Sequence, residues 1–274
     1  MIRRNADTAH LSTAGTMTDT ESERPPSPKN LLRDLRVAIA FLTRFPVGGA
    51  EGGLAAAGWA FPVAGLLVGL GGGMGYGLAI AIGAPGGVAA LLALAGTALI
   101  TGALHEDGLA DTADGFGGGT TPERKLEIMR DSRSGAFGVL ALVFSVALRA
   151  TALAAISEPG AAGAALIAAA ALSRGLLPGV MTALPLASRY GLAAAAGRPT
   201  NRTAWAAAGI GTVAALVLLG PGAGVMAIVL AGLAVAGLAL LARRQIGGYN
   251  GDTLGAAQQV AETAVLIAAA AHFA

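Results

Sequence analysis

Long apolar stretches separated by short polar connections run through most of the 274-residue chain. A membrane-spanning helix needs roughly 20 consecutive apolar residues. Stretches of about this length are found at 56–82, 87–104, 136–157, 161–184, 204–220, 223–242 and 256–273. The fourth stretch is interrupted by Arg174 and Pro178. The pattern predicts an all-α fold, a polytopic transmembrane helix bundle of about seven spans.

The chain before the first span has a different character. Residues 1–28 are rich in Ser, Thr, Glu and Pro and contain no apolar run, which predicts a disordered N-terminal tail. The segment from Leu31 to Phe45 places arginines among Leu, Ile and Phe, and Pro46 follows it. It is too short and too charged to span, so we expect an amphipathic helix on the membrane surface. Residues 29–274 then form one integral membrane domain, with 29–46 as its interfacial helix.

Composition supports membrane insertion. The chain is 54% hydrophobic and 12% charged, whereas a soluble domain has about 25% charged residues. The absence of cysteine excludes disulfides, thiol catalysis and cysteine-bound metals. A net charge of +2 gives no sign of a nucleic-acid partner. The 42 glycines allow close helix packing in the lipid bilayer, and they also permit a homo-oligomer.

The distribution of basic residues predicts the orientation. With the N-terminus inside, the cytoplasmic connections are 105–135, 185–203 and 243–255, whereas those near Gly83, Pro159 and Pro221 contain no Lys or Arg. Positive residues are enriched on the cytoplasmic side of membrane proteins. The N-terminus and the polar loops are therefore expected on the cytoplasmic face of a multi-pass protein of the cell (inner) membrane. Nine basic residues carry this pattern: Arg124, Lys125, Arg130, Arg133, Arg189, Arg198, Arg202, Arg243 and Arg244.

An acidic motif follows the second span. Glu106, Asp107, Asp111 and Asp114 fall within nine residues, and the three aspartates share one face if the segment is helical. Carboxylates crowded on one face repel each other unless a cation lies between them. Mg²⁺ suits such a site, because it binds oxygen ligands together with substrate phosphates. The alternative is a solvated loop with charges at a helix end.

Two pairs of arginines are also candidates, one pair shortly after the acidic motif and one pair inside predicted spans. Arg130 and Arg133 lie shortly after the acidic motif, and a guanidinium can donate two hydrogen bonds to a phosphate. The alternative is that both arginines only anchor the loop on the cytoplasmic side of the membrane, where positive residues are enriched. Arg149 and Arg174 lie near the middle of their spans, where a charge indicates either a function or a buried partner.

The last predicted cytoplasmic loop, residues 247–255, contains Asp252 among glycines. Gln258 and Glu262 follow on one face of the last helix, which favours a polar cavity there. Asp252 also suits the N-cap of that helix. His105 is given no role as a ligand.

Four motifs follow one another along the chain: Asp107 to Gly115, Leu126 to Arg133, Ser173-Arg174 and Gly251 to Ala257. In this order they resemble the cobalamin synthase family, and the resemblance covers nearly everything after the N-terminal tail. Two departures are small: Glu106 stands where the family commonly has an apolar residue, and Asn250 where threonine is common.

The resemblance implies an Mg²⁺-dependent membrane enzyme that joins α-ribazole, or its 5′-phosphate, to adenosylcobinamide-GDP with release of GMP. Phosphoryl transfer depends mainly on positioning and charge neutralisation. We hypothesise that Asp107, Asp111 and Asp114 hold Mg²⁺, and that Asp252 or Glu262 orients or deprotonates the ribazole hydroxyl. The predicted substrate-binding residues are Arg130, Arg133, Arg174, Asn250, Thr253 and Gln258.

Three other classes are less consistent with the sequence. A CDP-alcohol phosphotransferase requires Asp-Gly-x-x-Ala-Arg, but Asp111 follows Ala110 here. A prenyltransferase with two aspartate-rich loops is disfavoured because the second loop has only Asp252. A transporter is expected to show an internal repeat, and the two halves of this chain show none.

Overall fold

The computed structural model describes residues 28–48, 52–156 and 158–274. Most residues of these ranges are helical, and the ranges contain no strand apart from an isolated bridge between Leu186 and Tyr249. The predicted all-α fold is therefore confirmed, whereas the predicted tail lies outside the described residues except for Pro28. The helices are α1 (Pro28–Leu42), the 3-10 helix η2 (Ala56–Ala60), α2 (Phe61–Ala81), α3 (Gly86–Thr101), α4 (Leu104–Gly118), α5 (Pro122–Ile128), α6 (Ala136–Ala155), α7 (Pro159–Ala183), α8 (Leu192–Ala196), α9 (Asn201–Ile246) and α10 (Gly251–Phe273).

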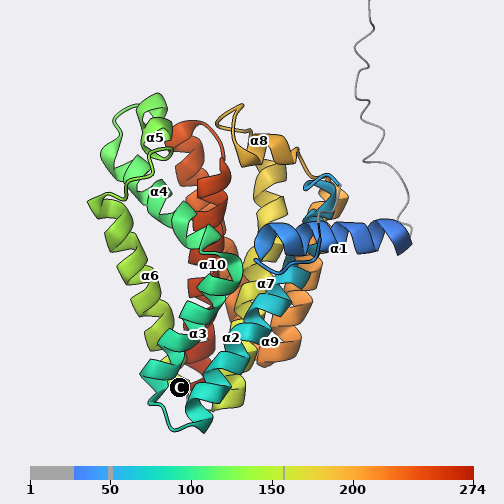
Figure 1. Ribbon diagram of the computed structural model, residues 1–274, viewed down its shortest axis with the longest axis vertical. Helices are drawn as coiled ribbons and strands as arrows, with labels where there is room; N and C mark the ends of the chain where they lie inside the picture. The colour runs from blue at the N-terminus through green and yellow to red at the C-terminus, as the bar shows by residue number, and fades with distance from the viewer. Residues whose placement is uncertain (1–27, 49–51, 157) are drawn as a thin grey trace, which may run out of the picture.

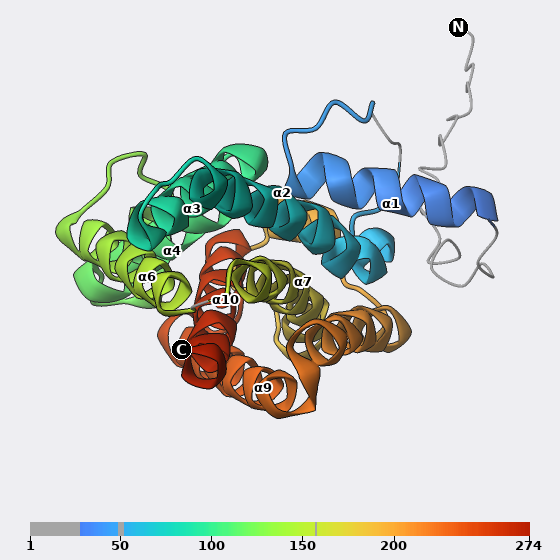
Figure 2. The same ribbon diagram turned by 90° about the horizontal axis from the view of Figure 1, so that it is seen from below.

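Helix α7 lies at the centre of the bundle, enclosed by α2, α9 and α10 (Figure 2). Small residues make this possible. A Cβ added to Gly65 of α2 would lie 2.3 Å from the Ala170 carbonyl oxygen, and one added to Gly69 would lie 2.4 Å from the Ile167 Cα. The two helices are therefore in backbone contact, which is typical of helix pairs packed through small residues in lipid.

Five helical segments among the described residues are long and apolar enough to cross a membrane: Ala56–Ala81, Ala136–Ala155, Pro159–Ala183, Asn201–Ile246 and Gly251–Phe273. Helices α3 and α4 form a sixth only if this bent pair counts as one crossing. The predicted spans 204–220 and 223–242 both fall within α9, which is interrupted at Gly220 (φ 74°, ψ 171°). A Cβ on Gly224 would lie 3.0 Å from the Leu216 Cα, so the chain folds back on itself around Gly220. The predicted count of seven treats these two halves separately.

The second predicted span ends earlier than expected. Its helix α3 stops at Thr101, and α4 leaves at 93° to it. Gly102 and Ala103 both adopt left-handed backbone conformations, with φ 67° and 55°. The backbone N–H of Arg44 donates to the Ile100 carbonyl at 2.7 Å, which attaches the segment after α1 to this turn. The acidic motif thus lies on a helix of its own rather than on an extension of α3.

Helix α1 lies across the bundle instead of along it (Figure 1). It ends at Leu42, three residues before the predicted end at Phe45, and Thr43 Oγ1 donates to the Ile39 carbonyl at 2.7 Å. Leu31 and Leu32 are exposed, whereas Leu42 is buried. This orientation is compatible with the predicted interfacial helix, and its position on a membrane surface stays a prediction.

The connections that were predicted to be cytoplasmic gather at one end of the bundle, together with α5 and α8 (Figure 1). The loop 184–191 is joined there to the loop before α10. The Tyr249 N–H donates to the Pro185 carbonyl at 2.9 Å, and the Ala187 N–H donates to the Tyr249 carbonyl at 2.8 Å. One end of the bundle therefore combines the polar segments that the sequence singled out.

Candidate active site

The site is built where α4 crosses the first turn of α10. A Cβ on Gly108 would lie 2.8 Å from the Asp252 carbonyl oxygen, and one on Gly255 would lie 3.1 Å from the Gly108 Cα. Only glycine permits this approach of the two backbones. The crossing brings Asp107 and Asp111 of α4 close enough to Asp252 for their charges to interact. We call these three residues the acidic cluster.

The acidic cluster carries three carboxylates, and none of them takes part in an ion pair within the described ranges. Asp252 Oδ2 accepts a hydrogen bond from Asn250 Nδ2 at 2.8 Å. Such an all-oxygen set fits a hard cation such as Mg²⁺ by its chemistry. No group of three acidic or histidine side chains in the described part of the chain is close enough to hold one metal ion. Magnesium binding therefore stays a prediction.

Asp114, the third predicted metal ligand, has other partners. Its Oδ2 accepts from the Gly135 N–H at 2.6 Å, and its Oδ1 accepts from the Gly138 N–H at 2.8 Å. The side chain is buried and satisfies two N–H groups at the beginning of α6, where helices leave such groups without an intrahelical acceptor. Asp114 therefore holds the α5–α6 loop against α4.

That loop carries the two predicted phosphate-binding arginines. Arg130 is exposed, interacts electrostatically with Asp252, and donates to Ser188 Oγ at 2.9 Å. Arg133 instead turns to Asp131, with its Nη2 at 2.7 Å from Asp131 Oδ2. Hydrogen bonds from the Arg133 side chain and backbone hold the pKa of Asp131 at about 2, below its usual range. Arg130 thus lies beside the acidic cluster, and Arg133 is paired within its own loop.

The N-terminus of α10 shows which residue caps this helix. Asn250 is the N-cap: its Oδ1 accepts from the Thr253 N–H at 2.9 Å, and Thr253 Oγ1 accepts from the Asn250 N–H at 2.9 Å. This reciprocal pair is a capping box. The prediction that Asp252 caps the helix is therefore wrong, because the helix begins at Gly251 and Asp252 lies within its first turn. The structure gives Asn250 and Thr253 this capping role, and their predicted substrate contacts stay untested.

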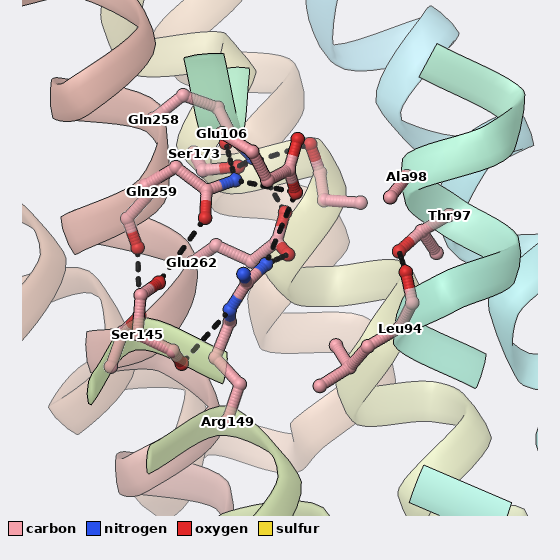
Figure 3. Close-up of polar contacts among 12 residues, drawn as sticks. Leu94, Thr97, Ala98, Glu106, Ser145, Arg149, Ser173, Gln258, Gln259 and Glu262 are labelled. Atoms are coloured by element: carbon pink, nitrogen blue, oxygen red, sulfur yellow. Dashed lines mark hydrogen bonds and ion pairs between the residues drawn. The ribbon is translucent and has the colours of Figure 1, made fainter. Parts of the chain in front are cut away.

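A second polar cluster lies deeper in the bundle (Figure 3). Glu262 links two buried arginines: its Oε1 is 3.0 Å from Arg149 Nη1, and its Oε2 is 3.5 Å from Arg174 Nη1. Glu106 lies 3.6 Å from the same Arg149 nitrogen. We call these four residues, from α4, α6, α7 and α10, the buried charge network. Two positive and two negative side chains balance in it, as burial of charge requires.

Amide side chains extend the network along α10. Gln258 donates to Ser173 Oγ at 3.0 Å and also to Glu262, and Gln259 donates to Glu106 Oε1 at 3.1 Å (Figure 3). Gln258 is fully buried. The structure therefore separates the predicted site residues into two groups. Asp107 and Arg130 are exposed and Asp111 and Asp252 are half-buried, whereas Arg174, Gln258 and Glu262 are buried.

Sequence reasoning did not assign His105 a role, yet it lines a cavity beside the acidic cluster. Apolar residues from six helices and from the segment before η2 form most of the wall. Asp107 and Asp252 are its acidic members. The only sequence signal was the position of His105 directly before the acidic motif. The partners of Asp114 had no such signal, because they are glycines more than twenty residues away.

A family model described as cobalamin-5-phosphate synthase matches residues 34–270. The adenosylcobinamide-GDP ribazoletransferase of Bradyrhizobium diazoefficiens is 52% identical over 247 residues, covering 89% of this chain and 95% of the relative. Its counterpart from Mesorhizobium japonicum is 49% identical over 246 residues, with the same coverage of both chains. That from Sinorhizobium medicae is 46% identical and covers 85% of this chain and 94% of the relative. No solved structure matches the chain.

Proposed function

The chain belongs to the cobalamin-5-phosphate synthase family, and from this premise we propose how its residues perform the ribazole transfer for which its relatives are named. Its function is that of a cobalamin synthase. A hydroxyl of α-ribazole, or of its 5′-phosphate, attacks the phosphorus on the cobinamide side of adenosylcobinamide-GDP. A new P–O bond forms, the bond to the GMP oxygen breaks, and GMP leaves.

One observation carries the assignment of the site. The Gly108–Gly255 crossing collects three carboxylates from two helices at the end of the bundle, with Arg130 beside them. A diphosphate is polyanionic, so a protein that accepts it needs cations between its own carboxylates and the substrate. Positioning and charge neutralisation are also the main requirements of phosphoryl transfer. The acidic cluster is the part of the described chain that meets this requirement best.

Asp107 and Asp111 are the proposed Mg²⁺ ligands. Mg²⁺ in such enzymes is usually bound through one or two carboxylates together with substrate phosphates, and two carboxylates on successive turns of α4 meet that need. Bound there, Mg²⁺ would neutralise the charge of the diphosphate. Asp114 is the weakest member of the predicted set, since both of its oxygens already accept backbone N–H groups.

Asp252 is the proposed acceptor of the ribazole hydroxyl proton. Of the two acids named for this role, it lies in the wall of the cavity and is oriented by Asn250. Glu262 is engaged on both oxygens by arginines in the buried charge network. Arg130 then stabilises the phosphate charge as GMP departs. Arg174, held by Glu262 and by the Ala170 carbonyl, keeps the network in place.

The site is proposed to face the cytoplasm of a cell inner membrane. The loops that gather at its end of the bundle contain the basic residues, whereas the turn at Gly83 contains none. Positive residues on one side support this orientation. The glycine-rich lipid-facing helices would also allow a homo-oligomer.

The test is an assay of membranes that contain the protein, adenosylcobinamide-GDP and α-ribazole, with and without Mg²⁺. Formation of corrinoid and GMP in equal amounts, abolished by EDTA and restored by Mg²⁺, is the expected result. Free α-ribazole and its 5′-phosphate are supplied in turn. Product formation that continues without any divalent cation would contradict the proposed role of Asp107 and Asp111.

A further inference from the structure

The cavity beside the acidic cluster is partly enclosed and has a volume of about 150 Å³. It lies among α1, α2, α4, α7, α8 and α10. Its wall is mainly apolar, with Phe41, Phe61, Leu177, Met181 and Ala193 among its members. Asp107 and Asp252 place carboxylates at the same cavity. An apolar space thus adjoins the atoms at which we place the chemistry.

The size and the lining decide what this cavity can take. An apolar cavity of about 150 Å³ lined by Leu, Ile and Phe is known to bind one benzene molecule. The corrin macrocycle of the acceptor is far larger than one aromatic group. Guanine carries donors and acceptors around its edge, and burying them against apolar side chains without partners is unfavourable. The adenine of the adenosyl group is disfavoured for the same reason. The benzimidazole base of α-ribazole is then the remaining aromatic base in the reaction, and it is largely apolar. It is bicyclic and therefore larger than benzene, and the partly open cavity leaves room for it.

His105 supplies an independent observation. It lines the cavity, it is 3% exposed, and its Nδ1 has no hydrogen-bond partner among the described residues. A buried polar atom without a partner is unusual in proteins and calls for an explanation. This nitrogen has no surface of its own at the cavity, so a hydrogen bond to a ligand there requires the His105 ring to turn toward it.

We propose that this cavity is the subsite for the benzimidazole base of α-ribazole, with the ribose directed to Asp252 and with His105 Nδ1 hydrogen-bonded to the nucleoside. This inference rests on the proposed function. It assigns the choice of lower-ligand base to Leu177, Met181 and Ala193, which limit the space around the ring. A larger side chain at Ala193 then favours smaller bases, and a smaller side chain at Leu177 favours larger ones.

Steady-state assays of the full-length protein in lipid nanodiscs test the assignment. Two ribosides are compared at saturating adenosylcobinamide-GDP, α-ribazole with its two ring methyls and the riboside of unsubstituted benzimidazole. Ala193→Leu is expected to raise the KM for α-ribazole at least tenfold and to shift the kcat/KM ratio at least fivefold toward the smaller riboside. The KM for adenosylcobinamide-GDP should stay within twofold. Ala206→Leu, the same change at an exposed position of α9, is the matched control.

The ratio of the kcat/KM values of the two ribosides, measured within one variant, does not depend on how much of that variant folds. Leu177→Ala is expected to shift the ratio the opposite way. Ratios within twofold of the unmodified protein in both variants would overturn the subsite. Binding of α-ribazole alone separates this outcome from a failure of the proposed function. If no corrinoid forms, binding that Ala193→Leu abolishes and Ala206→Leu preserves still supports the subsite, and absence of binding to the unmodified protein overturns it.

Discussion

Gly108 of α4 and Gly255 of α10 meet backbone to backbone, with only 3.1 Å between the Gly108 Cα and the place where a Cβ of Gly255 would lie. The contact joins the acidic motif to a residue almost 150 positions later in the chain. It brings Asp107 and Asp111 close enough to Asp252 for their charges to interact. The site therefore depends on two glycines that take no part in the chemistry themselves.

Gly108→Ala is expected to lower kcat by roughly 10- to 100-fold, because misplacement of reacting groups by about 1 Å has effects of this size. The new Cβ would lie 2.8 Å from the Asp252 carbonyl oxygen, so α4 and α10 must separate. Gly96→Ala in α3 is the control, since its Cβ meets no atom within 4 Å. Activity of Gly108→Ala equal to that of the control would show that the crossing does not set the site geometry.

Asp111→Asn and Asp114→Asn are expected to fail in different ways. Asp111→Asn should lose at least about 100-fold in kcat while inserting normally and losing no stability, since it removes a charge from a repulsive cluster. Asp114→Asn should lose about 1–3 kcal/mol of stability, because an amide offers one acceptor oxygen to two N–H groups. Thermal unfolding and turnover are measured for both. Equal stability of the two variants would count against the structural role of Asp114.

Mg²⁺ is expected to raise the Tm of the unmodified protein in the absence of substrate, as any ligand of the folded state does. The rise should disappear in Asp107→Asn and Asp111→Asn and persist in Asp114→Asn. Sodium chloride at the same ionic strength is the control. Loss of the rise in Asp114→Asn as well, at a temperature where the variant is folded, would restore all three aspartates as ligands.

Glu262→Gln is expected to destabilise the protein by about 3–5 kcal/mol, since removal of one partner leaves buried charge uncompensated. Arg149 and Arg174 would both lose their shared carboxylate. The double variant Glu262→Gln/Arg149→Met should recover part of the lost stability. A catalytic role for Glu262 would instead appear as lost turnover at unchanged Tm.

Cysteine labelling tests the proposed orientation, and the natural chain contains no cysteine to interfere. Thr120→Cys and Glu158→Cys place single thiols at exposed positions in the α4–α5 and α6–α7 connections. These two connections lie at opposite ends of the bundle (Figure 1). A membrane-impermeant maleimide should label Glu158→Cys in intact spheroplasts and Thr120→Cys only in inverted vesicles. The reverse pattern would move the site to the outer face.

The sequence predicted what depends on local pattern. Apolar runs located the long helices, and the break near Pro221 was expected at the place where α9 folds back. The bend between α3 and α4 was not foreseen, because it places Ala103, a good helix former, in a left-handed conformation. No rule of spacing indicates that a helix stops there.

The site was predicted in part for the same reason. Spacing placed Asp107 and Asp111 on one face, and the helix confirms it. Glu106 belongs to the same acidic motif but was not assigned to that face, and neighbouring helix positions point about 100° apart. Glu106 therefore faces Arg149 and Gln259 in the interior. Contacts between distant segments, such as Asp114 with Gly135, lie beyond any local pattern.

The buried charge network has a consequence for the axial position of α10. Asp252 and Glu262 are ten residues apart on one rigid helix, which is about 15 Å along its axis. A shift of α10 by a single turn would move both by about 5.4 Å and would pull Glu262 away from two arginines on different helices. The ion pairs of the network therefore hold α10 at one axial position. They thereby set the depth at which Asp252 meets α4.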